Sequence, residues 1–306
     1  GLVFDKIRTN IILQDNNLKI DDTSILINGK PLNIKGFVNA DTYSDITVHS
    51  EKLPLPGLFM AFAPSDLKKS VSMTAGNLSV DAKVVGELKT PVAYTNILVN
   101  DLGLRGKDNA FVINNEKLAI GAVTDLKTID GNISNKNFEF IIPSTNSVIS
   151  DNALNIKLTD KYIDILPSTI AINNASKIVI YGDIDDYSTY PKIEFNANGL
   201  LNANDLKQFA GESASPFIEA TGNLPLKVQV KGTNKKQSVT LQVKSDSTNY
   251  ITPVDVEFMR GKQSILQAKI DYKSDKLNIK KTGIYTGIQQ FSDDLENNLL
   301  NAQNIV

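Results

Sequence analysis

The chain contains one histidine, so His49 is the only imidazole that could serve as a general base. A Ser-His-Asp arrangement would have to use it, because the base must reach a serine hydroxyl and be oriented by a carboxylate. His49 lies in the alternating segment ITVHSEK, which predicts a solvent-facing strand residue. The segment GESAS, Gly211–Ser215, has the spacing of a nucleophile elbow but ends in serine and follows a helical pattern. We therefore expect no catalytic residue and no enzymatic activity.

Metal chemistry has equally little support in the sequence. Asp183, Asp185 and Asp186 are close together, but Ca²⁺ takes six or more converging oxygen ligands. Their segment, GDIDDYSTY, has the composition of a hairpin, and we interpret the carboxylates as turn residues. The chain has no cysteine, which excludes disulfides, thiolate metal sites and a cysteine nucleophile. We expect no metal ion and no cofactor.

The composition is that of a folded chain without a strong electric field. Hydrophobic residues make up 41% of the 306 residues, charged residues 22%, and the net charge is −2. Such a balance does not attract nucleic acid, and we expect no nucleic-acid partner. The longest apolar run, Leu53–Pro64, is too short to span a bilayer and contains prolines. Because the sequence begins without methionine and its first residues already lie inside a strand-like pattern, we expect a segment of a longer protein.

Most of the chain alternates apolar and polar residues with period two, which is typical of strands with one buried face. Turn signals separate the alternating runs, at Asn28–Pro31, Asp130–Asn132 and Asn173-Asn174. This spacing predicts an all-β chain of consecutive antiparallel strands.

Helical patterns occur in three places. Leu55–Lys69 is led by Pro56 and broken by Pro64. Asn204–Gly211 could be capped by Asn204 and ended by Gly211. Ser292–Val306 predicts a short amphipathic helix that packs on its own sheet.

The sequence repeats itself. GNLSVDAKVVG, Gly76–Gly86, matches GNLPLKVQVKG, Gly222–Gly232, in its glycines and its first three residues. Ser24–Gly36 similarly parallels Thr169–Gly182, and the two copies agree from about Leu18 to Gly86 before the match weakens. Like units of this kind stack on one another. We predict a first β unit over residues 1–148 and a second, continuous with it, over 149–306.

The predicted sheet has more apolar surface than short helices can cover. It could cover itself as a closed sandwich or barrel, or it could form an open groove filled by a ligand. Periodicity alone does not distinguish the two.

Several stretches resemble one family. VVGELKTPVAYTNILVNDLGLRG, Val84–Gly106, resembles the recurrent glycine, strand, proline, strand phrase of the AsmA-like family, which includes TamB- and YhdP-type proteins. Phe4–Val38 and Asn155–Ile184 are similar to that family's succession of strands ending in glycine. The resemblance extends over most of Phe4–Gly232, and it consists of patterns instead of invariant residues.

The resemblance implies a fold and a function. AsmA-like proteins are anchored in the inner membrane of two-membraned bacteria, and their β units form an elongated, curled antiparallel sheet with an apolar groove. Phospholipid transfer towards the outer membrane is the activity usually assigned to them. This chain would then be an internal or C-terminal periplasmic segment, tethered by an N-terminal helix and reaching both membranes through flanking regions that it lacks.

On this interpretation the partner is a phospholipid or another acyl lipid. Its chains would lie against apolar residues that the hydrophobic pattern places on one face: Ile25, Ile27, Ile34, Leu78, Val80, Ile170, Ile172, Ile180, Leu224 and Leu226. Two other interpretations remain open. One is a role in outer-membrane protein assembly through exposed strand edges, and the other is a closed β-sandwich surface or adhesin-like protein without lipid.

Overall fold

The computed structural model describes residues 3–39, 42–125, 127–173, 175–214, 218–233, 235–245, 250–253, 264–273 and 276–286. Its contacts divide the chain into two compact units. Unit 1 comprises Gly1–Phe140 and Asn155–Asp160, and unit 2 comprises Ile141–Leu154 and Lys161–Val306. The predicted boundary, after residue 148, lies inside the first segment of unit 2.

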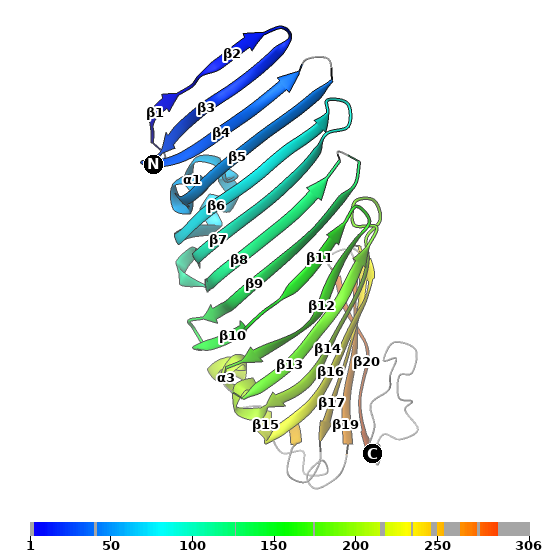
Figure 1. Cartoon of the computed structure of the whole chain (residues 1–306). Coiled ribbons are helices and arrows are strands. Elements are labelled where there is room, and N and C mark those ends of the chain that lie inside the picture. Colours follow the sequence, from blue (N-terminus) through cyan, green and yellow to red (C-terminus); the bar gives the residue numbers. More distant parts are fainter. Residues whose placement is uncertain are drawn as a thin grey trace. The chain divides into compact units, whose positions relative to one another are not determined.

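Unit 1 is an antiparallel sheet in which β1 and β2 both pair with β3, β3 to β8 pair in chain order, and β11 pairs with β9 (Figure 1). Its strands are β1 (Phe4–Arg8), β2 (Ile11–Gln14), β3 (Asn17–Ile27), β4 (Lys30–Asn39), β5 (Tyr43–Pro54), β6 (Val71–Glu87), β7 (Val92–Gly106), β8 (Val112–Thr124), β9 (Ile129–Ile142) and β11 (Asn155–Thr159).

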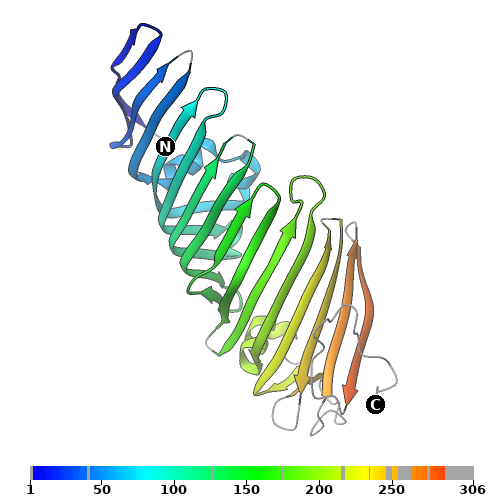
Figure 2. The same ribbon diagram turned by 45° about the vertical axis from the view of Figure 1, so that its right-hand side comes forward.

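Unit 2 has the same plan, with its strands side by side in chain order (Figure 2). They are β10 (Ser147–Asp151), β12 (Tyr162–Ile172), β13 (Ser176–Asp185), β14 (Lys192–Asn202), β16 (Asn223–Thr233), β17 (Lys236–Ser245), β19 (Ser264–Lys273) and β20 (Lys276–Thr286). A separate antiparallel pair joins β15 (Ile218–Thr221) and β18 (Tyr250–Pro253). The prediction of an all-β antiparallel chain with a few short helices is confirmed.

The helices lie where the sequence predicts them, with one error. The first pattern forms α1 (Leu55–Phe62) and α2 (Ser65–Ser70), separated at Pro64. The second forms α3 (Ala203–Ala214), in which Gly211 adopts a φ of 74° and interrupts the helical backbone. Asn204 is not its cap, because the side chain of Asn202 accepts the N–H groups of Asn204 and Asp205 at 2.9 and 3.4 Å. The third pattern, Ser292–Val306, lies outside the described residues. A 3₁₀ turn occupies Lys107–Asn109, and no helix in the described part of the chain is long and apolar enough to cross a membrane.

Of two turn predictions, one is confirmed and the other is wrong. Asn28 and Gly29 form a two-residue hairpin between β3 and β4, with φ of 49° and 74°, as the Asn-Gly signal predicts. The prediction of a turn at Asp130–Asn132 is wrong, because these residues lie inside β9 and pair with β11. Gly131 is needed there for space, since a Cβ added to it would lie 2.7 Å from the carbonyl oxygen of Gly121.

The repeat extends further in the structure than in the sequence. A register shift between Ile20 and Thr23 in β3 recurs between Ile165 and Ser168 in β12. Beyond the point where the sequence match weakens, the pair Ile97–Ile120 between β7 and β8 has its counterpart in Val243–Leu266 between β17 and β19. The two units therefore share strand order and register from β3 to β8 and from β12 to β19.

Glycines recur at equivalent positions within the repeated strands because a neighbouring backbone approaches them closely. A Cβ at Gly36 would lie 2.0 Å from the carbonyl oxygen of Asp45, and one at Gly232 would lie 2.1 Å from that of Lys236. Both residues also have φ above 140°, which disfavours L side chains. This explains why the glycines are the clearest matches between the two copies.

Candidate functional site

One face of the unit 1 sheet is built almost entirely from aliphatic side chains, and we call it the apolar face of unit 1. Directly paired residues share a face of an antiparallel sheet, so the strand registers define it. One row of paired residues runs from β3 to β8: Ile25, Leu32, Ser50, Val80, Ile97 and Ile120. The rows on either side of it are Thr23, Ile34, Val48, Ala82, Thr95 and Ala122, and Leu53, Leu78, Val99 and Leu118.

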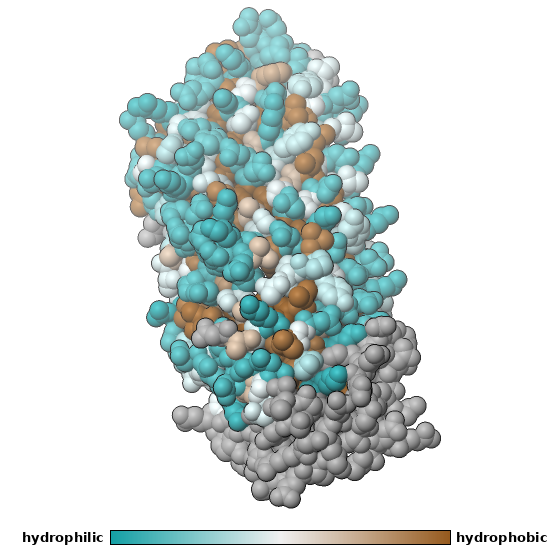
Figure 3. All heavy atoms as spheres, turned by 60° about the horizontal axis from the view of Figure 1, so that its bottom comes forward, coloured by the Kyte–Doolittle hydropathy of each residue, from teal (hydrophilic) through white to brown (hydrophobic). Residues whose placement is uncertain are grey.

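This face lacks a second layer in the part of unit 1 that the structure describes. Of its hydrophobic side chains, Ile27, Leu53 and Val99 are buried, with 6%, 4% and 8% of their surface exposed, whereas the others keep intermediate exposure. α1 packs against β6, where Leu55 Cδ1 would be 3.0 Å from a Cβ placed on Gly76. Figure 3 shows a surface on which hydrophobic side chains gather between hydrophilic ones. A closed sandwich would bury such a face completely.

The apolar face of unit 1 contains the five residues predicted for the first copy. Ile25 and Ile27 lie on β3, Ile34 lies on β4, and Leu78 and Val80 lie on β6. Val80 pairs directly with Ser50 and Ile97, and Leu78 pairs with Leu53 and Val99. The strand registers therefore bring these residues onto one surface.

The five residues predicted for the second copy also share one face, which we call the apolar face of unit 2. Leu224 and Leu226 are buried there in one cluster with Ile178, Ala197 and Val243. Ile170, Ile172 and Ile180 are partly buried and pack against that cluster. The two copies thus agree in which residues form the face but differ in how far it is enclosed.

In unit 2 the opposite face is also buried at β17 and β19. Val243 of β17 is 3% exposed on the apolar face, and its neighbour Gln242, on the other face, is fully buried. Gln242 Nε2 donates a hydrogen bond of 2.6 Å to Oε1 of Gln267 on β19. A polar residue at an alternating position usually indicates a solvent-facing side, so this burial was not predictable from the pattern.

The apolar face of unit 1 also contains small polar residues, and two of them, Ser50 and Ser44, have hydroxyl groups that are hydrogen-bonded within the sheet. Ser50 is fully buried, and its hydroxyl donates to the carbonyl oxygen of Pro31 at 2.7 Å. Ser44, also buried, donates to the carbonyl oxygen of Gly86 at 3.4 Å. Because these hydroxyl groups bond within the sheet, the surface they leave to a ligand is apolar.

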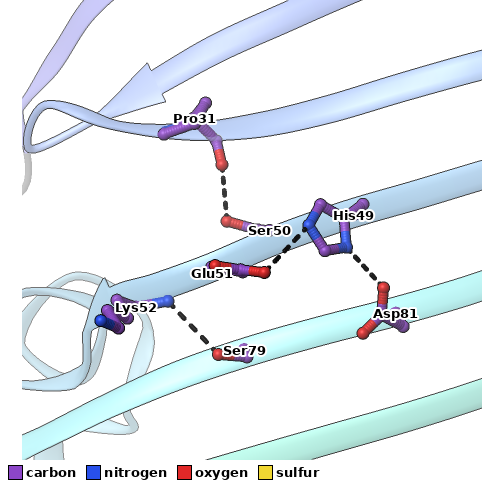
Figure 4. A network of polar contacts seen from close by, with 7 residues as sticks. All are labelled: Pro31, His49, Ser50, Glu51, Lys52, Ser79 and Asp81. Atoms are coloured by element: carbon purple, nitrogen blue, oxygen red, sulfur yellow. Dashed lines mark hydrogen bonds and ion pairs between the residues drawn. The ribbon is translucent and has the colours of Figure 1, made fainter.

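The other face of unit 1 is polar and carries the single histidine (Figure 4). His49 Nδ1 lies 2.5 Å from Asp81 Oδ1, and Nε2 lies 3.6 Å from Glu51 Oε1. The side chain is 43% exposed, which confirms the predicted solvent-facing position. The nearby hydroxyls have other partners, because Ser79 accepts the N–H of Lys52 and Ser50 points to Pro31. The described residues thus give His49 a carboxylate but no serine hydroxyl as a nucleophile.

Shallow hollows also lie on this polar face. Two of them, of about 420 and 560 Å³, share the lining residues Asn96, Gly121 and Asn132. Gly121 leaves the space open, since a Cβ there would lie 2.9 Å from Asn132 Oδ1. A third hollow, of about 620 Å³, is lined by Lys19, Phe37 and Asp45 among others.

The carboxylates of the GDIDDYSTY segment lie in or just after β13. Asp183 pairs with Asp164 on one side and Glu194 on the other, so three carboxylates form a row on the sheet. Burial, and then the charges of Asp185, Glu194 and Asp164, raise the pKa of Asp183 above its usual value. Within the described residues no three acidic or histidine side chains converge as metal ligands.

No protein-family model, curated protein or solved structure matches this chain. The site is therefore defined by the chain's own geometry: an aliphatic face, incompletely covered in unit 1 and more enclosed in unit 2. The sequence did not predict the role of Asp205. Its carboxylate accepts two hydrogen bonds from Ser176, one from the N–H and one from the hydroxyl, each of 2.7 Å, and these bonds hold α3 against β13.

Proposed function

We propose that the chain is a non-enzymatic lipid-binding segment whose apolar faces shield the acyl chains of a phospholipid or a similar lipid. The observation that carries this proposal is the incompletely covered apolar face of unit 1. Burial of apolar surface contributes about 25 cal/mol per Å², so a face left partly exposed favours an apolar occupant.

The dimensions of the face suit an acyl chain. Adjacent strands lie about 4.8 Å apart, so the row from Ile25 to Ile120 extends over about 24 Å. One leaflet of a bilayer has a hydrocarbon thickness of about 15 Å, half of the usual core of about 30 Å. An extended acyl chain therefore fits within one row, and its neighbouring rows would hold a second chain.

The character of the lining supports lipid over a folded partner. The rows consist of isoleucine, leucine, valine and alanine with three hydroxyl residues, Thr23, Ser50 and Thr95, and the hydroxyl of Ser50 bonds inside the sheet. A protein-binding surface usually carries aromatic anchors and arginine, which these rows lack. This lining and the AsmA-like sequence phrases favour the same assignment: phospholipid transfer in the periplasm between the inner and outer membranes.

The test is the lipid content of the purified protein. The chain is purified without detergent and extracted with organic solvent, and lipids are identified by mass spectrometry. We expect about one phospholipid or more per chain. Ile34→Asp should remove most of it while the fold is retained, because the new carboxylate lies on the apolar face of unit 1 and would contact the acyl chain.

The matched control is Lys35→Asp, which introduces the same residue one position further along β4 on the polar face. Its lipid content should equal that of the unmodified chain. A stable chain that carries no lipid, or equal lipid loss in both variants, would rule out acyl-chain binding on this face.

A further inference from the structure

We propose that the end of α1 and the start of α2 insert into the headgroup region of an anionic phospholipid membrane. We call this part of unit 1, Met60–Lys69, the helical tip. The inference does not depend on what the apolar faces bind. It rests on exposed hydrophobic side chains, on the basic groups around them, and on a counterpart in the repeat that has a different character.

The helical tip carries hydrophobic side chains that the rest of the chain does not cover. Met60, Phe62 and Leu67 are 62%, 72% and 45% exposed, and Phe62 is the most exposed aromatic side chain among the described residues. Met60 and Phe62 are two residues apart, which in an α-helix turns them about 200° from each other. Since both are exposed, the last turn of α1 protrudes into solvent at the end of β5 (Figure 1).

The composition of α1 does not suit a helix that has water on one side. It reads LPGLFMAF and has no polar side chain on any face, although none of its residues is fully buried. A helix that packs one face on a protein normally carries polar residues on the other face. The exterior of α1 is therefore adapted to a medium less polar than water.

The repeat shows that this exterior is not required by the fold. α3 lies between β14 and β16, as α1 and α2 lie between β5 and β6. It packs on β14 and β15 of its own unit, and its exterior includes Lys207 and Gln208. A helix at this place in the repeat can thus be polar outside, so the apolar exterior of α1 has another cause.

Basic side chains adjoin the hydrophobic ones. Lys68 Nζ donates to the carbonyl oxygen of Met60 at 3.2 Å, so an ammonium group lies beside the exposed end of α1. The side chain of Lys69 is 77% exposed and forms an ion pair of 3.4 Å with the carboxylate of Asp66. Because such a pair between exposed side chains contributes little free energy, Lys69 can exchange this partner for another anion.

The turns at the same edge of the sheet are also basic. β6 starts directly after α2 and pairs with the end of β7, so the turn between β7 and β8 lies beside the helical tip. Arg105 and Lys107 are exposed there, as is Lys30 in the turn between β3 and β4. Lysine and arginine outnumber the carboxylates along this edge. At the opposite edge, Glu87–Thr90 and Asp125–Thr128 each contain one acidic residue and one lysine.

This arrangement matches the interface of a membrane. Interfacial helices place aromatic and aliphatic side chains among the headgroups, and their lysines are attracted by anionic lipids. A pocket on a folded partner would enclose a single side chain such as Phe62. Positive charge that is spread over three turns is instead complementary to an extended anionic surface.

The first experiment is cosedimentation of the full chain with vesicles of phosphatidylcholine, with and without phosphatidylglycerol. We expect binding to the anionic vesicles, and added salt should weaken it. Phe62→Ser should lower the partition coefficient by about tenfold or more, because it removes the most exposed apolar group of the tip. Lys69→Gln should lower it by about fivefold. Both variants should fold, since both side chains extend into water.

Two control variants accompany this experiment. Phe209→Ser removes an aromatic side chain of α3 that is 41% exposed, and its binding should equal that of the unmodified chain. Ile34→Asp, which tests acyl-chain binding on the apolar face of unit 1, should also bind vesicles normally. Failure of the lipid-binding proposal and failure of this one can therefore be distinguished.

The second experiment uses the absence of tryptophan in the chain. Phe62→Trp introduces a single indole at the helical tip. Anionic vesicles should shift its fluorescence emission to shorter wavelength, and lipids with brominated acyl chains should quench it. Phe209→Trp is the matched control, and its emission should not change.

Three results would overturn the proposal. The chain could fail to bind the anionic vesicles, or its binding could be unaffected by Phe62→Ser. Alternatively, Phe209→Trp could respond to vesicles as strongly as Phe62→Trp. If the chain ignores vesicles but forms dimers that Phe62→Ser abolishes, the helical tip is a protein interface and membrane insertion is excluded.

Discussion

The difference in enclosure between the two units can be tested with one charge placed at equivalent positions. Leu32 on β4 pairs with Ile25, and its counterpart Ile178 on β13 pairs with Ile170. Leu32 has intermediate exposure, whereas Ile178 is 5% exposed in the unit 2 cluster. Leu32→Asp and Ile178→Asp therefore introduce the same carboxylate at equivalent positions of the repeat. The position in unit 1 is partly exposed, whereas the position in unit 2 is buried.

The expected magnitudes follow from burial. At Ile178 the substitution removes about 2 kcal/mol of side-chain burial. A buried carboxyl has its pKa raised by about 3 units, and at about 1.36 kcal/mol per unit this adds about 4 kcal/mol. The total, about 6 kcal/mol, is comparable with the whole stability of many domains. At Leu32 the carboxylate reaches water, so we expect a loss of about 1–2 kcal/mol.

The assay is urea unfolding followed by circular dichroism, with hydrogen exchange to assign each transition to unit 1 or unit 2. Asn33→Asp, on the polar face beside Leu32, is the control and should change the unfolding free energy by less than about 0.5 kcal/mol. Because the carboxyl introduced at position 178 has a raised pKa in the folded state, its penalty should be present at pH 7. That penalty should decline as the pH falls towards the unfolded value of about 4.

The reasoning about an open face would be refuted if Leu32→Asp destabilised unit 1 as strongly as Ile178→Asp destabilises unit 2. The apolar face of unit 1 would then be covered as completely as a closed core, and the basis of the proposed lipid binding would disappear.

Two further substitutions test the close approach at Gly36 and the acidic row. Gly36→Ala should cost about 3 kcal/mol or more in thermal or urea unfolding, because its Cβ would lie 2.0 Å from the carbonyl oxygen of Asp45. Gly29→Ala, where no atom lies within 4 Å, should cost about 1 kcal/mol from its φ of 74° alone, and equal costs would contradict the steric argument. Asp183→Asn should raise the midpoint of thermal unfolding at pH 7, because the raised pKa of Asp183 makes its charged form unfavourable in the fold. This gain should vanish at a pH below the unfolded pKa of Asp, and a gain independent of pH would show that charge is not its cause.

The sequence by itself determined the class of fold and much of the candidate surface. Period-two alternation is enough to predict strands, because successive side chains of a strand point to opposite faces. For the same reason it placed Ile25, Ile34 and Val80 on one face before any register was known. The glycine matches indicated the repeat, since Gly36 and Gly232 are fixed by the close approach of a neighbouring backbone.

Tertiary structure alone decided how far each face is covered. Leu78 and Leu224 are equivalent residues in the repeat, yet Leu224 is fully buried and Leu78 has intermediate exposure. Burial depends on which distant elements pack against a strand, and alternation contains no information about them. Gln242 is a second example. Its polar side chain predicts a solvent-facing position, but in the structure it is buried and hydrogen-bonded to Gln267.

The difference in exposure between β2 and β11 was likewise not predictable from the sequence. Ile11 and Leu13 alternate as Ile156 and Leu158 do, and only the strand pairing shows that one set meets β9 while the other is exposed. Local sequence fixes the direction in which a side chain points, because that direction follows from the backbone of its own strand. What the side chain meets is fixed by long-range pairing, which brings together residues far apart in the chain.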